Sequence, residues 1–308
     1  MKTIDIICIG EVLIDCIGHE VDTSICQTKN YHRFLGGSPT NVAVNASKLG
    51  LNSLLVATCG KDGFGDYIVE KLQKNGVDCS SLRQDEAHPT SVIFVSKSTT
   101  TPDFVAYRQA DAQILESQVA EEKLKQAKIF HTTCFALSKN PAQQTILTLA
   151  KKAQSLGLQT SIDINYAEKI WPNKEEAKAV IVSYLQTNPI VKLSEDDCLR
   201  WFGEEKTDAF IFNYFHSLGA QLICFTKGKK GVVVSEEGKQ PYVQPALAID
   251  EIKDATGAGD AFWTGFLYSQ IFKKSLDESV ALAQKLAAIK LQSVGKLPED
   301  FTIEDLVF

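Results

Sequence analysis

Short apolar runs alternate with longer amphipathic segments along most of the chain. The runs are rich in β-branched residues, and the segments between them repeat apolar side chains at helical spacing, which is the pattern of βα units. The predicted strands are 4–9, 53–58, 129–132, 159–164, 190–193 and 222–226, and the predicted helices are 39–49, 64–74, 141–156, 174–185, 257–272 and 276–292. We therefore expect an α/β fold with a mainly parallel sheet covered by helices.

Two stretches, 12–35 and 89–108, break this alternation. Both contain strand-like patterns, such as 91–96 and 104–107, with no helix between them. They predict antiparallel strands in a small second sheet, which would act as a lid over a site on the main sheet. Because no Pro- or Ser-rich linker separates them from the rest, we expect one domain over residues 1–308 with the lid built from insertions.

Composition narrows the classes of function. The chain has 308 residues, 44% of them hydrophobic, and a net charge of −6 without a basic block, so neither a nucleic acid nor an anionic membrane surface is an expected partner. No apolar stretch reaches bilayer length. The eight cysteines form no CxxC pair, which indicates reduced core residues and not a zinc cluster. We expect a cytoplasmic protein.

The segment from Asp254 to Phe262 carries the strongest chemical signal. It reads Asp-Ala-Thr-Gly-Ala-Gly-Asp-Ala-Phe and leads into a predicted helix. The amides of Gly257, Ala258, Gly259 and Asp260 would point out of that helix N-terminus, where an anion such as a phosphate is favoured. A carboxylate at this point can accept a proton from an alcohol that attacks the phosphate, so Asp260 is the candidate base.

The simplest alternative is a tight turn in which Asp260 only caps the helix. Two other nucleotide fingerprints are excluded. The Walker pattern GxxxxGK[ST] does not occur, and Gly257-Ala-Gly259 lacks the third glycine of GxGxxG, which also argues against a Rossmann dehydrogenase.

A second glycine site, Gly36-Gly37-Ser-Pro-Thr-Asn41, leads into the helix predicted at 39–49. The paired glycines allow a ligand to approach the backbone, and Asn41 offers a donor and an acceptor, which would suit a polyol. Taken alone, such a segment is more often a structural junction between a loop and a helix.

These two segments, in this order and separation, resemble the two signatures of the ribokinase-like (PfkB) carbohydrate kinases, and the resemblance covers nearly the full chain. Gly10-Glu11 with Asp15 is similar to the family's first substrate strand. The segment 60–65 followed by 75–78 is similar to its next βα unit, and Thr226-Lys-Gly228-Lys-Lys-Gly231 is similar to its nucleotide loop.

The resemblance implies a three-layer ribokinase-like core with a β lid over a sugar, and ATP along the C-terminal half. Asp260 would be the base, the amides of 257–260 would hold the transferred phosphate, and Mg²⁺ would bridge the phosphates of ATP. The residues implied for the sugar are Asp15, Gly36, Gly37, Asn41, Arg108 and Asp163. Those implied for the nucleotide are Ser194, Thr226, Gly228, Gly231 and Gly259.

Departures from the family pattern at Ser194, Asp197 and Ala167 bear on these roles. The family's N-x-x-E motif is Ser194-Glu-Asp-Asp197 here, so the water-held Mg²⁺ would fall to Asp197, while a helix cap at Ser194 is a compatible reading. An arginine of the D-x-N-x-R stretch is Ala167, which makes an acidic sugar less expected. Arg108 would return a cation to the site, unless it forms only a rim salt bridge.

Asp254 and Thr256 resemble the site at which relatives bind a potassium-like cation. Ala255 stands where a Thr or Ser is usual, and the residues around 293–295 match only loosely. Since the match at Asp254 and Thr256 remains despite these differences, the resemblance implies K⁺ as a further cofactor.

The function that this resemblance implies is an ATP-dependent sugar kinase that phosphorylates a primary hydroxyl, with fructose as the first expected acceptor. Ribose, ketodeoxygluconate, a nucleoside and a phosphosugar remain open. An alternative of another class is a catalytically slow sugar or nucleotide sensor. Pairing of the lids predicts a homodimer.

Overall fold

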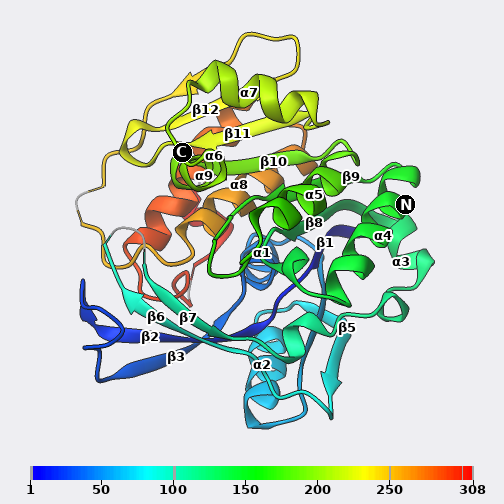
Figure 1. Cartoon of the computed structure of the whole chain (residues 1–308), viewed down its shortest axis with the longest axis vertical. Coiled ribbons are helices and arrows are strands. Elements are labelled where there is room, and N and C mark those ends of the chain that lie inside the picture. Colours follow the sequence, from blue (N-terminus) through cyan, green and yellow to red (C-terminus); the bar gives the residue numbers. More distant parts are fainter. Residues whose placement is uncertain (1–2, 100–101, 250, 300, 307–308) are drawn as a thin grey trace.

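The computed structural model describes residues 3–99, 102–249, 251–299 and 301–306, which form two sheets and the helices around the larger one (Figure 1). The larger sheet has nine strands in the order β13-β12-β11-β10-β9-β8-β1-β4-β5. Its strands are β1 (Ile4–Ile9), β4 (Ser53–Gly60), β5 (Asp78–Asp85), β8 (Ala127–Thr133), β9 (Gln159–Asp163), β10 (Ile190–Ser194), β11 (Leu222–Thr226), β12 (Val232–Glu236) and β13 (Tyr242–Gln244).

In this sheet order, all neighbouring strands between β11 and β5 pair in parallel. β12 and β13 extend the sheet beyond β11 as antiparallel strands. The difference follows from the connections. Helices separate β8 from β9, β9 from β10 and β10 from β11, whereas only a 3₁₀ turn, η4 (Gly228–Lys230), separates β11 from β12. A connection that short permits only a hairpin.

Helices cover both faces of this sheet, as expected of a three-layer α/β fold (Figure 1). The side chains of β1 show the two faces, because Ile7 and Ile9 belong to one apolar cluster and Ile6 and Cys8 to the other. The first cluster includes side chains of α4, α5, α6 and α7, and the second includes side chains of α1, α2, α8 and α9. The α-helices are α1 (Ser38–Lys48), α2 (Gly63–Lys74), α3 (Glu121–Gln126), α4 (Ala142–Ser155), α5 (Lys174–Leu185), α6 (Glu195–Phe202), α7 (Asp208–Ser217), α8 (Ala258–Ile271) and α9 (Leu276–Leu291).

The small sheet lies beside this core, with strands in the order β3-β2-β6-β7. Its strands are β2 (Leu13–Val21), β3 (Tyr31–Gly36), β6 (Val92–Lys97) and β7 (Phe104–Tyr107). They have an apolar cluster of their own that includes Leu13, Ile17, Ile93 and Val95. The two stretches that interrupt the βα pattern therefore do form a second sheet.

One detail of this sheet corrects the expectation of antiparallel strands throughout. β2 pairs with β6 in parallel, with Ile14 opposite Val92, while the β2–β3 and β6–β7 pairs are antiparallel. The reason is the path of the chain. β2 follows β1 and β6 follows β5, which are parallel strands of the main sheet, so both leave the core in the same direction and return through β3 and β7.

Most predicted elements coincide with observed ones, and four match to the residue: β1, β7, α5 and β11. No prediction was made for β5, β12, β13, α7 and the short α3, and for α6 only a cap at Ser194 was expected. Within the described part of the chain, no helix is long and apolar enough to cross a membrane.

Candidate functional site

Asp260 lies in the first turn of α8 and is held by residues from the start of α1. The Ser38 hydroxyl donates to its Oδ1 at 2.6 Å, and the Asn41 amide donates to its Oδ2 at 2.8 Å. Gly257, the residue before the helix, has a left-handed backbone with φ of 76°, and no side chain caps α8 among the described residues. The Ala258 amide donates to the Ala255 carbonyl at 3.2 Å, so among the described residues the amides open to a ligand beside the Asp260 carboxylate are those of Gly257, Gly259 and Asp260.

The surroundings of Asp260 favour a carboxylate that accepts protons. Burial raises the pKa of Asp260, while the hydrogen bonds from Ser38 and Asn41 and the charges of Lys192 and Lys290 lower it in part. The net shift is upward. A carboxyl with a raised pKa is a better proton acceptor near neutral pH than an exposed one.

Asp15 on β2 faces the same space from the small sheet. Burial and the negative charges of Asp260 and Asp254 raise the pKa of Asp15 to about 7. Gly36 lies against this side chain, and a Cβ at Gly36 would overlap the Asp15 carboxylate. Gly37 has a φ of 102°, and a Cβ there would overlap the Glu11 carbonyl oxygen. The two glycines are therefore required by close packing around Asp15 and Glu11.

Glu11 itself supports the start of α1. Its Oε1 accepts the Ser38 backbone N–H at 3.0 Å, and its Oε2 accepts the Thr133 hydroxyl at 3.1 Å. Burial raises the pKa of Glu11 to about 8, with opposition from its hydrogen bonds and from the charge of Arg108. Glu11 thus fixes the position of Ser38, whose hydroxyl donates to Asp260.

On the other side of Asp260, Lys192 and Asp163 form a buried ion pair. Lys192 on β10 is opposite Asp163 on β9 in the sheet register, and its Nζ lies 3.0 and 2.8 Å from the two carboxylate oxygens. Burial lowers the pKa of Lys192, but the charges of Asp163, Asp197 and Asp260 outweigh this effect and raise it. The Nζ is 3.3 Å from the point at which Gly259 would carry a Cβ. A fixed cation therefore lies beside the α8 amides.

Asp197 is buried in the first turn of α6 and bonded to its neighbour Ser194. Its Oδ2 accepts the Ser194 N–H at 2.9 Å and the Ser194 hydroxyl at 2.6 Å, and its own N–H donates to that hydroxyl. Oδ1 is 3.8 Å from Arg200. The compatible reading of a helix cap is thus observed, and one carboxylate oxygen remains outside the cap.

The residues expected at the nucleotide lie at the carboxyl ends of neighbouring strands. Ser194 at the end of β10 is opposite Thr226 at the end of β11. Gly228 and Gly231, in the turn that follows, have φ values of 52° and 104°, and a Cβ at Gly231 would overlap the Gln244 carbonyl. The structure brings these residues together, separate from the Ser38–Asn41–Asp260 cluster.

Arg108 lies outside both groups. It is buried, pairs with Asp111 at 2.6 Å, and contacts the Ser138 hydroxyl and the ring of Phe135. It is therefore not a rim residue, and its charge acts on the Glu11 carboxyl.

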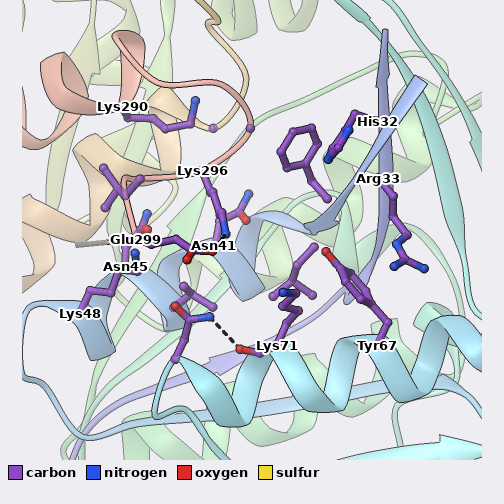
Figure 2. Close-up of a pocket in the computed structure, with 17 residues that line it drawn as sticks. His32, Arg33, Asn41, Asn45, Lys48, Tyr67, Lys71, Lys290, Lys296 and Glu299 are labelled. Carbon is purple, nitrogen blue, oxygen red and sulfur yellow. Dashed lines mark hydrogen bonds and ion pairs between the residues drawn. The ribbon is translucent and has the colours of Figure 1, made fainter. Parts of the chain in front are cut away.

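A cavity of about 270 Å³ adjoins the Asp260 cluster through Asn41 and Gly257. Basic side chains surround much of it, as Figure 2 shows; they are Arg33, Lys48, Lys71, Lys290 and Lys296. Arg33 lies over the ring of Tyr67 at 3.9 Å, and Lys296 pairs with Glu299. The cavity is thus suited to an anionic group beside the proton acceptor.

Ser38, Glu11, Lys192 and Lys290 had no predicted role at this site. Lys192 left a signal, because it is the one charged residue in the apolar run Ile-Val-Lys-Leu, and a lysine in a buried parallel strand needs a paired carboxylate. The sequence contains no comparable signal for Lys290, because a lysine on an amphipathic helix usually faces solvent.

Comparison with known proteins agrees with this geometry. Residues 3–299 match the model of the pfkB family carbohydrate kinases. The chain is 35% identical to an ATP-dependent 6-phosphofructokinase of Thermoanaerobacterium thermosaccharolyticum, over 99% of this chain and 94% of that protein. Among solved structures, it resembles the fructokinase of Halothermothrix orenii (TM-score 0.80, 32% identity, 91% of this chain and 98% of that one).

A third similar structure is a sugar kinase of Pyrococcus horikoshii in complex with ATP, with a TM-score of 0.84 and 28% identity over 98% of both chains. The site geometry, the family match and these relatives lead to one conclusion. The chain belongs to the pfkB family of carbohydrate kinases and is an ATP-dependent sugar kinase.

Proposed function

We propose that this kinase transfers the γ-phosphate of ATP to a primary hydroxyl of fructose, with Asp260 as the base. The observation that carries the proposal is the Ser38–Asn41–Asp260 cluster, which joins the two glycine segments at one carboxylate. In this mechanism Asp15 and Asn41 orient the sugar and Asp260 takes the proton of the attacking hydroxyl. The amides of Gly257, Gly259 and Asp260 hold the charge that develops on the phosphate.

The nucleotide would lie along Ser194, Thr226, Gly228 and Gly231. Ala167 stands where the family pattern has an arginine, so that cation is missing here. Lys192 would supply a cation near the transferred phosphate instead. Mg²⁺ is bound in such sites by one or two carboxylates together with phosphates and water. The Asp197 Oδ1, which lies outside the helix cap, fits this donor set through water, whereas both Asp163 oxygens already accept from Lys192. When bound, Mg²⁺ would neutralise phosphate charge.

The small sheet would act as the lid, so that sugar is enclosed and water excluded before transfer. Its edge strand β7 exposes Val105 and Tyr107, which supports pairing of two lids in a homodimer. Sedimentation equilibrium measures this state. The eight cysteines are free and five are buried, which supports a reducing, cytoplasmic location.

A second candidate acceptor is a phosphorylated ketohexose. The basic cavity beside Asn41 favours it, since Arg33 and Lys71 line it without a carboxylate within ion-pair distance among the described residues. The relative from Thermoanaerobacterium, named as a 6-phosphofructokinase, points the same way.

The test is ADP release with Mg·ATP and either fructose or fructose 6-phosphate, with ribose, ketodeoxygluconate and nucleosides as further acceptors. We expect the highest kcat/KM for fructose and little effect of Arg33→Met on that value. A higher kcat/KM for fructose 6-phosphate that Arg33→Met lowers at least tenfold would favour the second candidate. Binding of sugars without turnover would instead favour the sensor.

A further inference from the structure

Lys290, near the end of α9, places a buried ammonium beside the buried carboxylate of Asp254. The residue is 2% exposed, and Asp254 is fully buried. The Lys290 Nζ is 3.8 Å from the Asp254 Oδ2 and donates to the Ser293 carbonyl at 3.2 Å. In Figure 2 the Lys290 side chain lies at one end of the basic cavity, away from Lys71.

The Asp254 carboxylate holds together the backbone segments at this end of the site. Its Oδ1 accepts the Thr256 N–H at 3.0 Å, and its Oδ2 accepts the Gly295 N–H at 2.8 Å. Thr256 directly precedes Gly257, and the Lys290 Cε is 3.6 Å from the point at which Gly257 would carry a Cβ. The pair of Asp254 and Lys290 therefore supports the turn that presents the α8 amides.

This arrangement can be compared with the monovalent cation that the family resemblance implies at Asp254 and Thr256. The region 293–295, expected to complete that site, supplies the carbonyl that Lys290 already contacts. Burial lowers the pKa of Lys290, and the charges of Asp254 and Asp260 oppose that shift. A potassium ion added here would place a second positive charge next to the ammonium, where Asp254 is the carboxylate in ion-pair contact and Asp260 acts only through its field.

One observation would suit a bound cation. The Thr256 hydroxyl oxygen is buried and has no hydrogen-bond partner in the described part of the chain. The ammonium, however, has three N–H donors, and among the described residues it makes one hydrogen bond, to the Ser293 carbonyl, besides its ion pair with Asp254. The Lys290 ammonium thus already balances the Asp254 carboxylate, and its positive charge disfavours a potassium ion beside it.

We propose that the Lys290 ammonium replaces the monovalent cation of this site, so that the kinase needs no potassium. Lys290 is then a positioning residue: it acts through Asp254 and the turn at Gly257 on the amides that hold the transferred phosphate. The inference rests on the proposed kinase reaction for its kinetic readout, and the binding readout described next is independent of that reaction.

The first experiment compares wild-type kcat in potassium, sodium and tetramethylammonium chloride at one ionic strength. We expect values within about twofold of one another. Lys290→Ala removes the charge and makes room for an ion. We expect its kcat in tetramethylammonium to fall at least tenfold, and potassium to restore part of the loss in a saturable way. Lys290→Arg, which keeps the charge, should remain active and insensitive to potassium.

The second experiment measures binding of Tl⁺, a potassium mimic, by thallium NMR. We expect no bound signal for wild type and a bound signal for Lys290→Ala. Lys274→Met, which removes a half-exposed lysine paired with Glu278, is the matched control and should behave as wild type in both experiments.

Severalfold activation of wild type by potassium, or a bound Tl⁺ signal in wild type, would overturn the proposal. So would a loss in Lys290→Ala that potassium does not restore together with the same loss in Lys290→Arg, since a purely structural lysine gives that result. If Lys290→Ala does not fold, the wild-type salt comparison and Tl⁺ spectrum decide. If no sugar is phosphorylated in any salt, the proposed function fails, while the Tl⁺ result still tests the cation site.

Discussion

Two helices of the site begin with an aspartate in the first turn, and their carboxylates are held in opposite ways. Asp260 on α8 is bonded by Ser38 and Asn41, which are 222 and 219 positions away. Asp197 on α6 is bonded by Ser194, three positions away. A local bond of this kind is a capping box and starts a helix. Bonds from a distant segment instead indicate a carboxylate placed by the tertiary fold for another purpose.

The largest difference between the two aspartates is expected in kcat, from the variant Asp260→Asn. The amide keeps the size of the side chain but cannot accept the proton of the sugar hydroxyl, so kcat should fall about 10³-fold. Coupled measurement of ADP release with fructose gives this value. Asp277→Asn, in the first turn of α9, is the matched control and should keep full activity. A loss below tenfold in Asp260→Asn would remove the contrast between the two helices.

A stability effect is expected from Lys192→Met, because it leaves the buried Asp163 carboxylate without its partner. We expect the free energy of unfolding to fall by about 3 kcal/mol, measured by urea denaturation. The double variant Lys192→Met with Asp163→Asn should recover a large part of that loss, since the Asp163 charge is removed together with its partner. If the single variant is as stable as wild type, the pair lies in a wetter environment than its burial indicates.

The smallest effect is expected from Asp197→Asn. The amide oxygen can still accept from Ser194, so the loss of unfolding free energy should stay below about 1 kcal/mol. At saturating Mg²⁺ the rate should fall less than tenfold, while the Mg²⁺ concentration for half-maximal rate should rise. A titration of rate against free Mg²⁺ measures both. A 10³-fold loss at saturating Mg²⁺ would place Asp197 beside Asp260 in importance and contradict the contrast drawn above.

The sequence predicted those parts of the fold that depend on local pattern. β1, α5 and β11 were found to the residue because a run of buried apolar residues or a helical repeat with a clear cap defines each of them. The parallel pairing of β2 with β6 was not predictable in this way, because it depends on the direction in which two separate excursions leave the main sheet.

The same division holds for the site. Gly36, Gly37 and Asp260 stand in segments whose composition indicates ligand binding, and the structure places them around one space. Lys290 and Ser38 could not be assigned, because their roles come from contacts with Asp254 and Asp260 that only the folded chain provides. Lys192 is an intermediate case. A charge in an apolar strand requires a partner, but the sequence does not identify which residue that partner is.

The bonds from Ser38 and Asn41 to Asp260 also bear on protein synthesis. A ribosome makes the chain from its N-terminus, so a nascent chain that ends before residue 258 contains both the small sheet and the start of α1. It lacks the proton acceptor and the amides of α8. The reactive centre therefore cannot assemble until α8 has been synthesised, and a chain that ends before this helix can hold neither the base nor the phosphate cradle that phosphoryl transfer requires.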